Sequence, residues 1–515
     1  MAEKQDKRPP YGIIGVLLIG AFITFLNNTL LNIALPSIMK DLEIEAATVQ
    51  WLTTGFMLVN GILIPATAFL IQKYSVRNLF LVAMSLFTIG TLVAGVAHEF
   101  PILLAGRMLQ ASGSAIMMPL LMNVMLVSFP IEKRGTAMGV FGLIIMFAPA
   151  IGPTLSGWII EHYDWRMLFH FITPISVLVV LIGFFLLKDK KEKSNLRLDF
   201  FSLILSSIGF GGILYGFSSA GSKGWDSPHV YLAIAIGFIS LVTFILKQMK
   251  QDHPLLNFGV FKYPMFALSS TISMVTNMAL FSGMILIPIY VQTIRGISPL
   301  DAGLMLLPGA IAMAIMSPIT GRLFDKFGGR VLALIGLGIT VITTYEFSQL
   351  SVDLSYTHLV ILYTVRMIGM SFVMMPVSTN GLNQLPTRFY PHGTAMNNTL
   401  NQVAGAIGTA LLVTVMSNRT ETHAKEIADE AMKTAAGQGA GAGAAQPTAE
   451  MIAQMKEQIM MKAMLEGIND AFLVATGISI VAFILAFFIK RATQAEDPME
   501  EKETSKVVPG ELAEN

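Results

Sequence analysis

The feature that most constrains this sequence is a repeated series of long apolar segments between about residue 12 and residue 490. An α-helix rises 1.5 Å per residue, so about 20 apolar residues cross a hydrocarbon layer of ~30 Å. The chain is 54% hydrophobic and only 13% charged, which leaves too little polar surface to cover a water-soluble globule. The sequence therefore predicts an all-α protein that crosses a membrane many times.

We expect fourteen membrane-spanning helices. The first apolar run has no small-residue cleavage site, so we expect it to be retained as a helix. The predicted spans are 12–36, 47–71, 78–97, 100–127, 134–160, 166–187, 199–219, 229–249, 265–293, 300–323, 330–350, 357–382, 393–417 and 471–490.

The orientation in the membrane follows from the distribution of lysine and arginine in the short loops. Alternate loops are rich in these residues, as in the stretch from Lys188 to Arg197 after the sixth span. The short loops on the other side hold only Lys40, Arg166, Lys223 and Arg295. Since basic loops stay inside the cell, we expect both termini in the cytoplasm.

Several kinds of chemistry are excluded by the composition. The chain has no cysteine, which rules out disulfides, thiolate metal sites and cysteine nucleophiles. A formal net charge of +1 indicates no nucleic-acid partner, and the sequence contains no G-x-x-x-x-G-K-[ST] loop for ATP. We expect no enzyme activity, metal or cofactor, so any transport must draw on an ion gradient.

An internal duplication organises the chain. The segment PATAFLIQKYSVR from Pro65 aligns without gaps with PITGRLFDKFGGR from Pro318, and RGTAM from Arg134 is repeated as HGTAM from His392. We therefore predict two six-helix halves, 1–196 and 251–490, with two inserted helices in 197–250, a layout typical of transporters. Residues 418–469 should form an external helical hairpin, and 491–515 a cytoplasmic tail.

Five motifs together carry a family resemblance. They are LNNTLLNIALP (26–36), GRMLQASGSAIMMP (106–119), GVFGLIIMFAPAIGPTLSGW (139–158), DWRMLF (164–169) and GRLFDKFGGR (321–330). With them the chain resembles the fourteen-span drug:proton antiporter branch of the major facilitator superfamily, the EmrB/QacA group, and within it the lincomycin-resistance type of exporter. The resemblance covers residues from about 12 to 490. It implies the major facilitator fold in the bacterial cytoplasmic membrane, acting as a monomer among membrane lipids, with small lipophilic substrates and protons as partners.

The third of these motifs resembles the antiporter motif of the fifth helix. Small residues let helix backbones approach closely, and a proline removes a backbone donor and bends the helix. We expect a tight, hinged contact here, although Ala148 and Ser156 stand where the family pattern has glycine. Ordinary small-residue packing is the alternative. The hinge residues are Gly139, Gly152, Pro153 and Gly157.

The fifth motif resembles the gating loop of the superfamily, in which a glycine permits close helix contact and an aspartate holds the inner side closed. Gly321 and Asp325 occupy those positions, and Arg330 is one of the basic residues. In the first half Ala68 and Gln72 replace the glycine and the aspartate, so we expect a weaker contact there. A solvated basic loop is the alternative interpretation.

A coupled antiporter needs a titratable group inside the membrane. The helix-one motif of the family usually begins with aspartate, but this chain has Asn27, which cannot carry a proton. The interior candidates are Glu346, which we expect to pair with Arg366 by a count of helical depth, and Arg107, which relatives implicate in proton handling. The alternatives are a Glu346 that reaches the outer interface and a structural Arg107.

A substrate cavity is predicted from methionines and amides. The chain has 33 methionines, whose flexible thioethers suit ligands of varied shape, although most such residues simply pack. Amide clusters offer hydrogen bonds to a substrate or, as an equal alternative, between helices. The cavity candidates are Asn27, Asn28, Asn32, Met117, Met146, Asn397 and Asn398.

These observations favour proton-coupled export of neutral or weakly basic lipophilic compounds, because the interior lacks the carboxylates that would hold a dication. One rival is a dedicated exporter or flippase for a single endogenous lipid or metabolite. A rival of another class is a membrane sensor that transports nothing, which the retained gating and hinge motifs disfavour.

Overall fold

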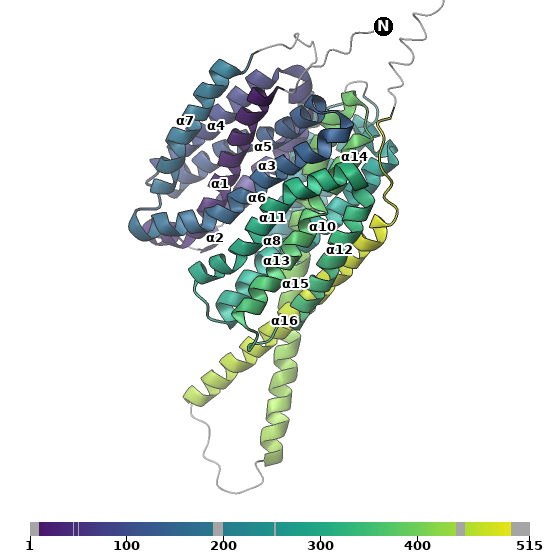
Figure 1. Ribbon diagram of the computed structural model, residues 1–515. Coiled ribbons are helices and arrows are strands. Elements are labelled where there is room, and N and C mark those ends of the chain that lie inside the picture. The colour runs from purple at the N-terminus through teal and green to yellow at the C-terminus, as the bar shows by residue number, and fades with distance from the viewer. Residues whose placement is uncertain are drawn as a thin grey trace, which may run out of the picture.

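The computed structural model describes residues 10–44, 46–49, 51–188, 199–251, 254–438 and 449–495, and the regular elements in these ranges are all helices (Figure 1). The first half contains α1 (Tyr11–Asp41), α2 (Ala46–Val49), α3 (Trp51–Lys73), α4 (Val76–Gly95), α5 (Phe100–Ser128), α6 (Ile131–His162) and α7 (Met167–Leu186). Next come the two inserted helices, α8 (Phe200–Lys223) and α9 (Pro228–Gln248).

The second half begins with the short η1 (Phe258–Lys262). It continues with α10 (Pro264–Ile289), η2 (Tyr290–Ile294), α11 (Pro299–Phe327), α12 (Gly329–Glu346), η3 (Phe347–Gln349), α13 (Tyr356–Ser371), α14 (Met374–Asn383), η4 (Thr387–Phe389), α15 (Tyr390–Gln438) and α16 (Ala449–Ala486).

The predicted spans coincide with these helices to within a few residues at most ends. By length and composition, 13 stretches in the described part of the chain can cross a membrane. The predicted fifth span corresponds to α6, which has 32 residues and carries charged residues in its first turn. The 13 stretches and α6 together account for the fourteen predicted spans. The fold is that of a polytopic membrane protein.

The twelfth span differs from the prediction because it is two helices, α13 and α14. Pro376 has no N–H, so it cannot donate to the carbonyl of Phe372 one turn earlier. At the end of α13 the Phe372 N–H donates to Gly369 O, three residues earlier and 3.1 Å away, so the last turn of this helix is tightened. The chain therefore breaks between α13 and α14, within the second half.

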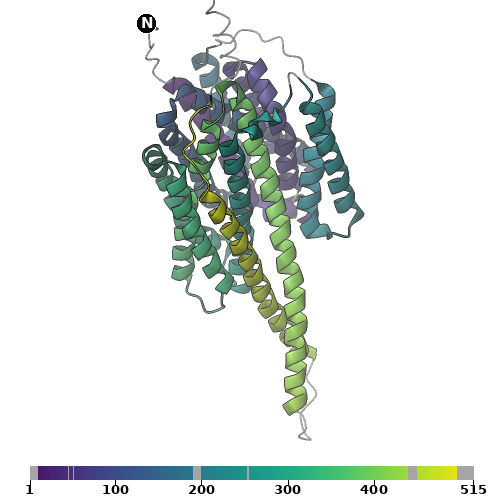
Figure 2. The ribbon, with the colours of Figure 1, turned by 90° about the vertical axis from the view of Figure 1, so that its right-hand side faces the viewer.

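The predicted hairpin is built from continuations of two spans. Residues 418–436 contain no glycine or proline, so α15 continues without a break for 49 residues, and α16 begins well before its apolar part. Figure 1 and Figure 2 show α15 extending beyond the rest of the bundle, and Figure 1 shows α15 and α16 spreading apart there. The Nε2 of His423 lies 2.9 Å from Asp470 Oδ2, and Arg419 pairs with the same carboxylate. The glycine-rich stretch 439–448 lies outside the described residues.

The inserted helices contact both halves. Trp51 of α3 stacks on Tyr215 of α8 at 5.9 Å, and the Trp225 indole N–H donates to Thr414 Oγ1 of α15 at 2.6 Å. The predicted domain boundaries at 196/197 and 250/251 fall within or beside 189–198 and 252–253, which the structure does not describe.

The bundle has two ends. At the end that holds the hairpin, the DWRMLF motif ties α7 to α1: Arg166 Nη1 and Trp165 Nε1 donate to Asp41 Oδ2 at 2.8 and 3.1 Å. At the opposite end, here the termini end, α1 begins and the segment after α16 passes α11, where Arg491 donates to Asp325 O.

Candidate functional site

At the termini end the two halves meet along a seam of small residues on α6 and α11. The seam consists of Gly135, Gly139, Gly142, Ser317 and Gly321. A Cβ added at Gly139 would lie 2.6 Å from Ser317 O and 2.9 Å from Pro318 Cα. One added at Gly321 would lie 3.1 Å from Gly139 Cα and closer still to the Gly135 carbonyl. Larger side chains would force the two halves apart, so glycine is required at both positions.

Asp325 closes this seam with charge-assisted hydrogen bonds. Its Oδ1 accepts from Gly135 N at 2.8 Å, and its Oδ2 accepts from Thr136 N at 2.8 Å and Thr136 Oγ1 at 2.6 Å. These donors lie near the start of α6, where the helix dipole also favours a negative charge. The structure thus places Gly321 and Asp325 in one inter-half contact. Arg330 is exposed and forms no ion pair among the described residues.

Two further contacts cross between the halves at this end, one of them at Gln72, where the sequence predicted a weaker contact. Arg134 of α6 donates to Asn383 Oδ1 of α14 at 3.2 Å, and its guanidinium lies 4.9 Å from the centre of the Tyr390 ring. Gln72 of α3 lies against His392 of α15, with 2.5 Å between their Nε2 atoms.

The duplication explains this arrangement. Asp325 and Gln72 occupy matching positions in the two copies of the loop motif. Asp325 contacts the RGTAM segment of the first half, and Gln72 contacts the HGTAM segment of the second. Each half therefore reaches across to the other by the same route, but only one of the two contacts carries a formal charge. The repeated GTAM segments were the sequence signal for this pairing.

The predicted hinge lies where α6 packs on α1. A Cβ added at Gly152 would lie 2.8 Å from Thr29 Cβ, and Ser156 Oγ donates to Leu30 O at 2.6 Å. The helix runs through residues 153 and 157, and the side chain of Pro153 is outside the described residues. Gly139 belongs to the seam with α11, so the motif serves two different helix contacts.

Arg107 is fully buried in α5 and has several partners. Its Nη1 donates to Gln110 Oε1 at 2.9 Å, its Nη2 to Asn28 Oδ1 at 3.2 Å, and its Nε to Leu52 O at 3.4 Å. The guanidinium also lies 4.4 Å from the centre of the Phe56 ring. A guanidinium in lipid needs such partners, and here amides and a ring supply them without any carboxylate.

The predicted pair between Glu346 and Arg366 is wrong in this structure. Glu346 ends α12 with an exposed side chain, and the next residue, Phe347, is the one that turns inward, 5.9 Å from the Arg366 guanidinium. Arg366 instead donates to Ala279 O of α10 at 2.7 Å. Successive residues of a helix point about 100° apart around its axis. The sequence gives the depth of Glu346 along α12, but its side chain points away from Arg366.

No described aspartate or glutamate is buried. The buried residues with ionisable or permanently charged groups in the described ranges, tyrosines aside, are Arg107, Arg134, Arg366 and His392. The interior of the bundle is therefore cationic or neutral, and it lacks the carboxylate that the family pattern would place at Asn27.

The predicted cavity residues separate into different environments. Met146 lines a small cavity of about 10 Å³ between the halves, together with Gly142, Met313, Ser317, Ser371, Met374 and Met375. Met117 is fully buried and packs close to Gly20 of α1. The cavity has room for no more than about one water molecule and is far below the ~300 Å³ of a typical drug-sized site, as expected while the seam is closed.

The amide candidates are engaged with neighbouring groups. Asn397 donates to Ser378 Oγ at 2.9 Å, and Asn398 donates to Thr394 O at 2.9 Å. Asn27 is the exception, because it is buried and its Nδ2 has no hydrogen-bond partner among the described residues. Asn28 is the acceptor for Arg107, and the side chain of Asn32 is outside the described residues.

Comparisons with known proteins agree with this architecture. The chain is 46% identical to the uncharacterized MFS-type transporter YhcA of Bacillus subtilis, over 98% of each chain. It is 43% identical to the lincomycin resistance protein LmrB of Bacillus subtilis, over 95% of this chain and 97% of that one. The crystal structure of the human organic anion transporter MFSD10 has the same fold, with a TM-score of 0.64 at 13% identity, and the match covers 93% of this chain and 100% of that chain.

The model of the Major Facilitator Superfamily matches residues 17–409, which include the seam, both copies of the loop motif and both GTAM segments. Members of this family are membrane transporters and not enzymes. With two half-bundles meeting at a closed seam, the chain belongs to the major facilitator superfamily as a multi-pass transporter of the cytoplasmic membrane.

Proposed function

We propose that the protein exports small lipophilic compounds across the cytoplasmic membrane in exchange for protons. The observation that carries this proposal is the seam between α6 and α11, closed by Asp325 on Gly135 and Thr136. The hydrogen bonds of Asp325 are polar and lie at one end of the bundle, so they can break and re-form as the halves rock. The likeness to a lincomycin resistance protein supports an antibiotic-like substrate.

The termini end is cytoplasmic in this proposal, because the basic loops gather there. The seam is then the inner gate, and the structure corresponds to a state closed toward the cytoplasm. Residues 1–196 and 251–490 act as the two moving halves of a monomer, with the inserted helices beside them.

The charge of the interior bears on the substrate. Arg107 and Arg366 are fully buried, and the described interior holds no carboxylate that would balance the charge of a cationic drug. Like charges in a medium of low dielectric repel strongly, so we propose neutral or acceptor-rich compounds over dications. A dedicated exporter of one endogenous lipid or metabolite would share this interior, and only a panel of substrates separates the two.

Inverted membrane vesicles test the function directly. A proton gradient, acid inside, should drive uptake of lincomycin and other neutral lipophilic compounds, and an uncoupler should abolish it. Uptake of only one endogenous lipid would favour the dedicated exporter. No uptake of any compound, with the protein correctly inserted, would contradict the proposal and leave the sensor as the better account.

The orientation can be tested with single cysteines, because the chain has none of its own. Thr422→Cys on the hairpin should react with an impermeant maleimide in intact cells. Lys490→Cys, after the last span, should react only once the membrane is permeabilised. The opposite pattern would place the seam at the outer face and reverse the assignment of the gate.

A further inference from the structure

The imidazole of His392 is held at the inner gate by contacts that fit only its neutral form. It lies in the first turn of α15 and is 5% exposed. The backbone N–H of Asn257 donates to its Nδ1 at 3.2 Å, so this nitrogen presents a lone pair. The ring proton of the neutral form then lies on Nε2 and faces the Gln72 amide, 2.5 Å away, whose oxygen accepts it when the amide is turned toward the ring.

A protonated imidazole carries N–H groups on both nitrogens and accepts from neither. Protonation would place an N–H on Nδ1 that points at the Asn257 N–H, so this hydrogen bond would be lost and the two hydrogens would repel each other. It would also place a charge in a buried site. The charged residues on the neighbouring elements include the cations Lys73 on α3, Lys262 on η1, Arg388 on η4 and Arg134 on α6. Lys73 lies over the Phe69 and Tyr74 rings, and α14 carries no charged residue.

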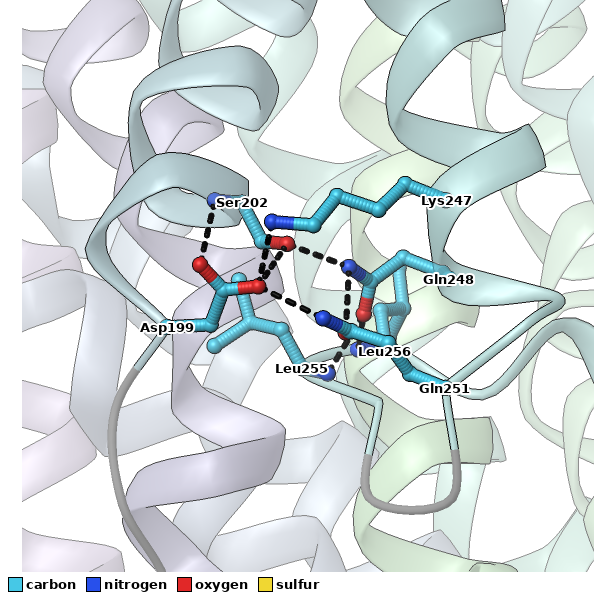
Figure 3. Close-up of polar contacts among 7 residues, drawn as sticks. All are labelled: Asp199, Ser202, Lys247, Gln248, Gln251, Leu255 and Leu256. Atoms are coloured by element: carbon cyan, nitrogen blue, oxygen red, sulfur yellow. Dashed lines mark hydrogen bonds and ion pairs between the residues drawn. The ribbon is translucent and has the colours of Figure 1, made fainter.

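The inserted helices fix the backbone that contacts His392. Gln248 at the end of α9 accepts from Leu255 N at 2.5 Å and Leu256 N at 3.4 Å, directly before Asn257 (Figure 3). Its amide in turn donates to Ser202 Oγ of α8 at 2.7 Å. The segment Leu255 to Asn257 therefore cannot move away from His392 without breaking this network.

The charged core of the network stays constant over the range in which histidine titrates. Figure 3 shows Lys247, Gln251 and Ser202 directed at the Asp199 carboxylate, with Lys247 Nζ at 2.5 Å. Burial opposes ionisation of Asp199, but these hydrogen bonds outweigh it and hold the pKa of Asp199 below its usual range. Asp199 and Lys247 form an ion pair whose charges cancel, so the switching group is His392 alone.

We infer that His392 is a proton-binding site of the inner gate, and that the gate closes only when this histidine is neutral. When the seam opens, the contact with Gln72 of the other half breaks and water reaches the imidazole, so His392 takes up a proton from the cytoplasm more readily. Closure must then return that proton to the cytoplasm. In an exporter that exchanges substrate for protons, this requirement ensures that His392 has released its proton to the cytoplasm before the substrate-loaded protein changes to its outward-open state.

The inference rests on the proposed function only in taking the seam as the inner gate. It can be tested without substrate or gradient. Ser317→Cys places a thiol in the closed seam, where a maleimide added to inverted vesicles reacts only when the gate opens. The labelling rate, divided by that of the exposed Lys490→Cys to correct for thiol ionisation, should rise as the pH falls from about 8 to about 5.5. The rise can reach about tenfold per pH unit, because one proton favours the open state.

His392→Gln should remove this pH dependence, since an amide keeps a donor and an acceptor but cannot be protonated. Gln72→Glu should weaken the dependence, because a carboxylate that faces the ring in the closed state stabilises the imidazolium there and lets the protonated gate close. The matched control His423→Gln, on the hairpin, should retain the original profile.

A wild-type pH profile in His392→Gln, or an equally steep profile in Gln72→Glu, would overturn the inference. Should His392→Gln fail to insert, Gln72→Glu alone decides. Loss of export with an intact pH profile would count against the proposed function and leave the proton site in place. If the wild-type protein exports substrate but its labelling rate does not change with pH, the proposed function stands and the proton site at His392 is ruled out.

Discussion

Asp325→Asn is expected to reduce export by about tenfold or more at matched expression. The asparagine oxygen can still accept from Gly135 N, but its NH₂ group would face the Thr136 N–H, which donates to Oδ2 in the structure. Hydrogen bonds to a charged group contribute about 1.5–3 kcal/mol each, so losing one shifts the gate strongly toward the open state. The measurement is the initial rate of substrate uptake into inverted vesicles.

Gly321→Leu should be at least as damaging, for a steric reason. Its Cβ alone would lie closer than van der Waals contact to the Gly135 backbone. Gln72→Ala should be milder, because the contact it removes is between neutral groups. Glu346→Gln is the matched carboxyl-to-amide control and should stay near the wild-type rate, since Glu346 is exposed and unpaired. Equal damage from all four changes would contradict the assignment of the gate to Asp325.

Arg107→Ala is expected to abolish export, with a fall of about 100-fold or more. The change removes three donors at once and leaves Asn28 Oδ1 and Gln110 Oε1 without their buried partner. Each orphaned buried acceptor costs about 1–3 kcal/mol, and the cation over the Phe56 ring is lost as well. Both substrate binding and coupled proton movement should fall.

Arg107→Lys separates charge from geometry. An ammonium keeps the positive charge but cannot reach Asn28, Gln110 and the Leu52 carbonyl together. Partial recovery of export would show that the charge matters in itself, and no recovery would assign the effect to the hydrogen-bonding fork. Wild-type export by Arg107→Ala would remove this residue from the transport mechanism.

The spans could be predicted from sequence because the bilayer fixes a minimum apolar length, which composition reveals directly. The sequence analysis expected a helical hairpin after residue 417, but it did not show that α15 continues into it without a break, since a charged helix outside the membrane leaves no hydropathy signal. The break before Pro376 was also missed, because a proline inside a membrane helix more often leaves it continuous.

The gate was half predicted. Gly321 and Asp325 stood out because their motif resembles the gating loop of the superfamily, but their partners Gly135 and Thr136 lie about 190 residues away in sequence. The duplication marked Arg134 and His392 as matching positions without showing what they contact. The depth of Glu346 along its helix was readable, whereas its direction around the helix was not. The direction of a side chain around its helix depends on how the neighbouring helices pack, and this packing cannot be derived from a single sequence.

The most direct test of proton-coupled export uses purified protein in liposomes that contain a pH-sensitive dye. With the protein oriented by the single-cysteine assay, a substrate gradient imposed without any initial pH difference should move protons in the opposite direction. The dye signal should disappear in Arg107→Ala and persist in Glu346→Gln. Substrate movement at the wild-type rate with no change in internal pH would contradict the account and identify the protein as a uniporter.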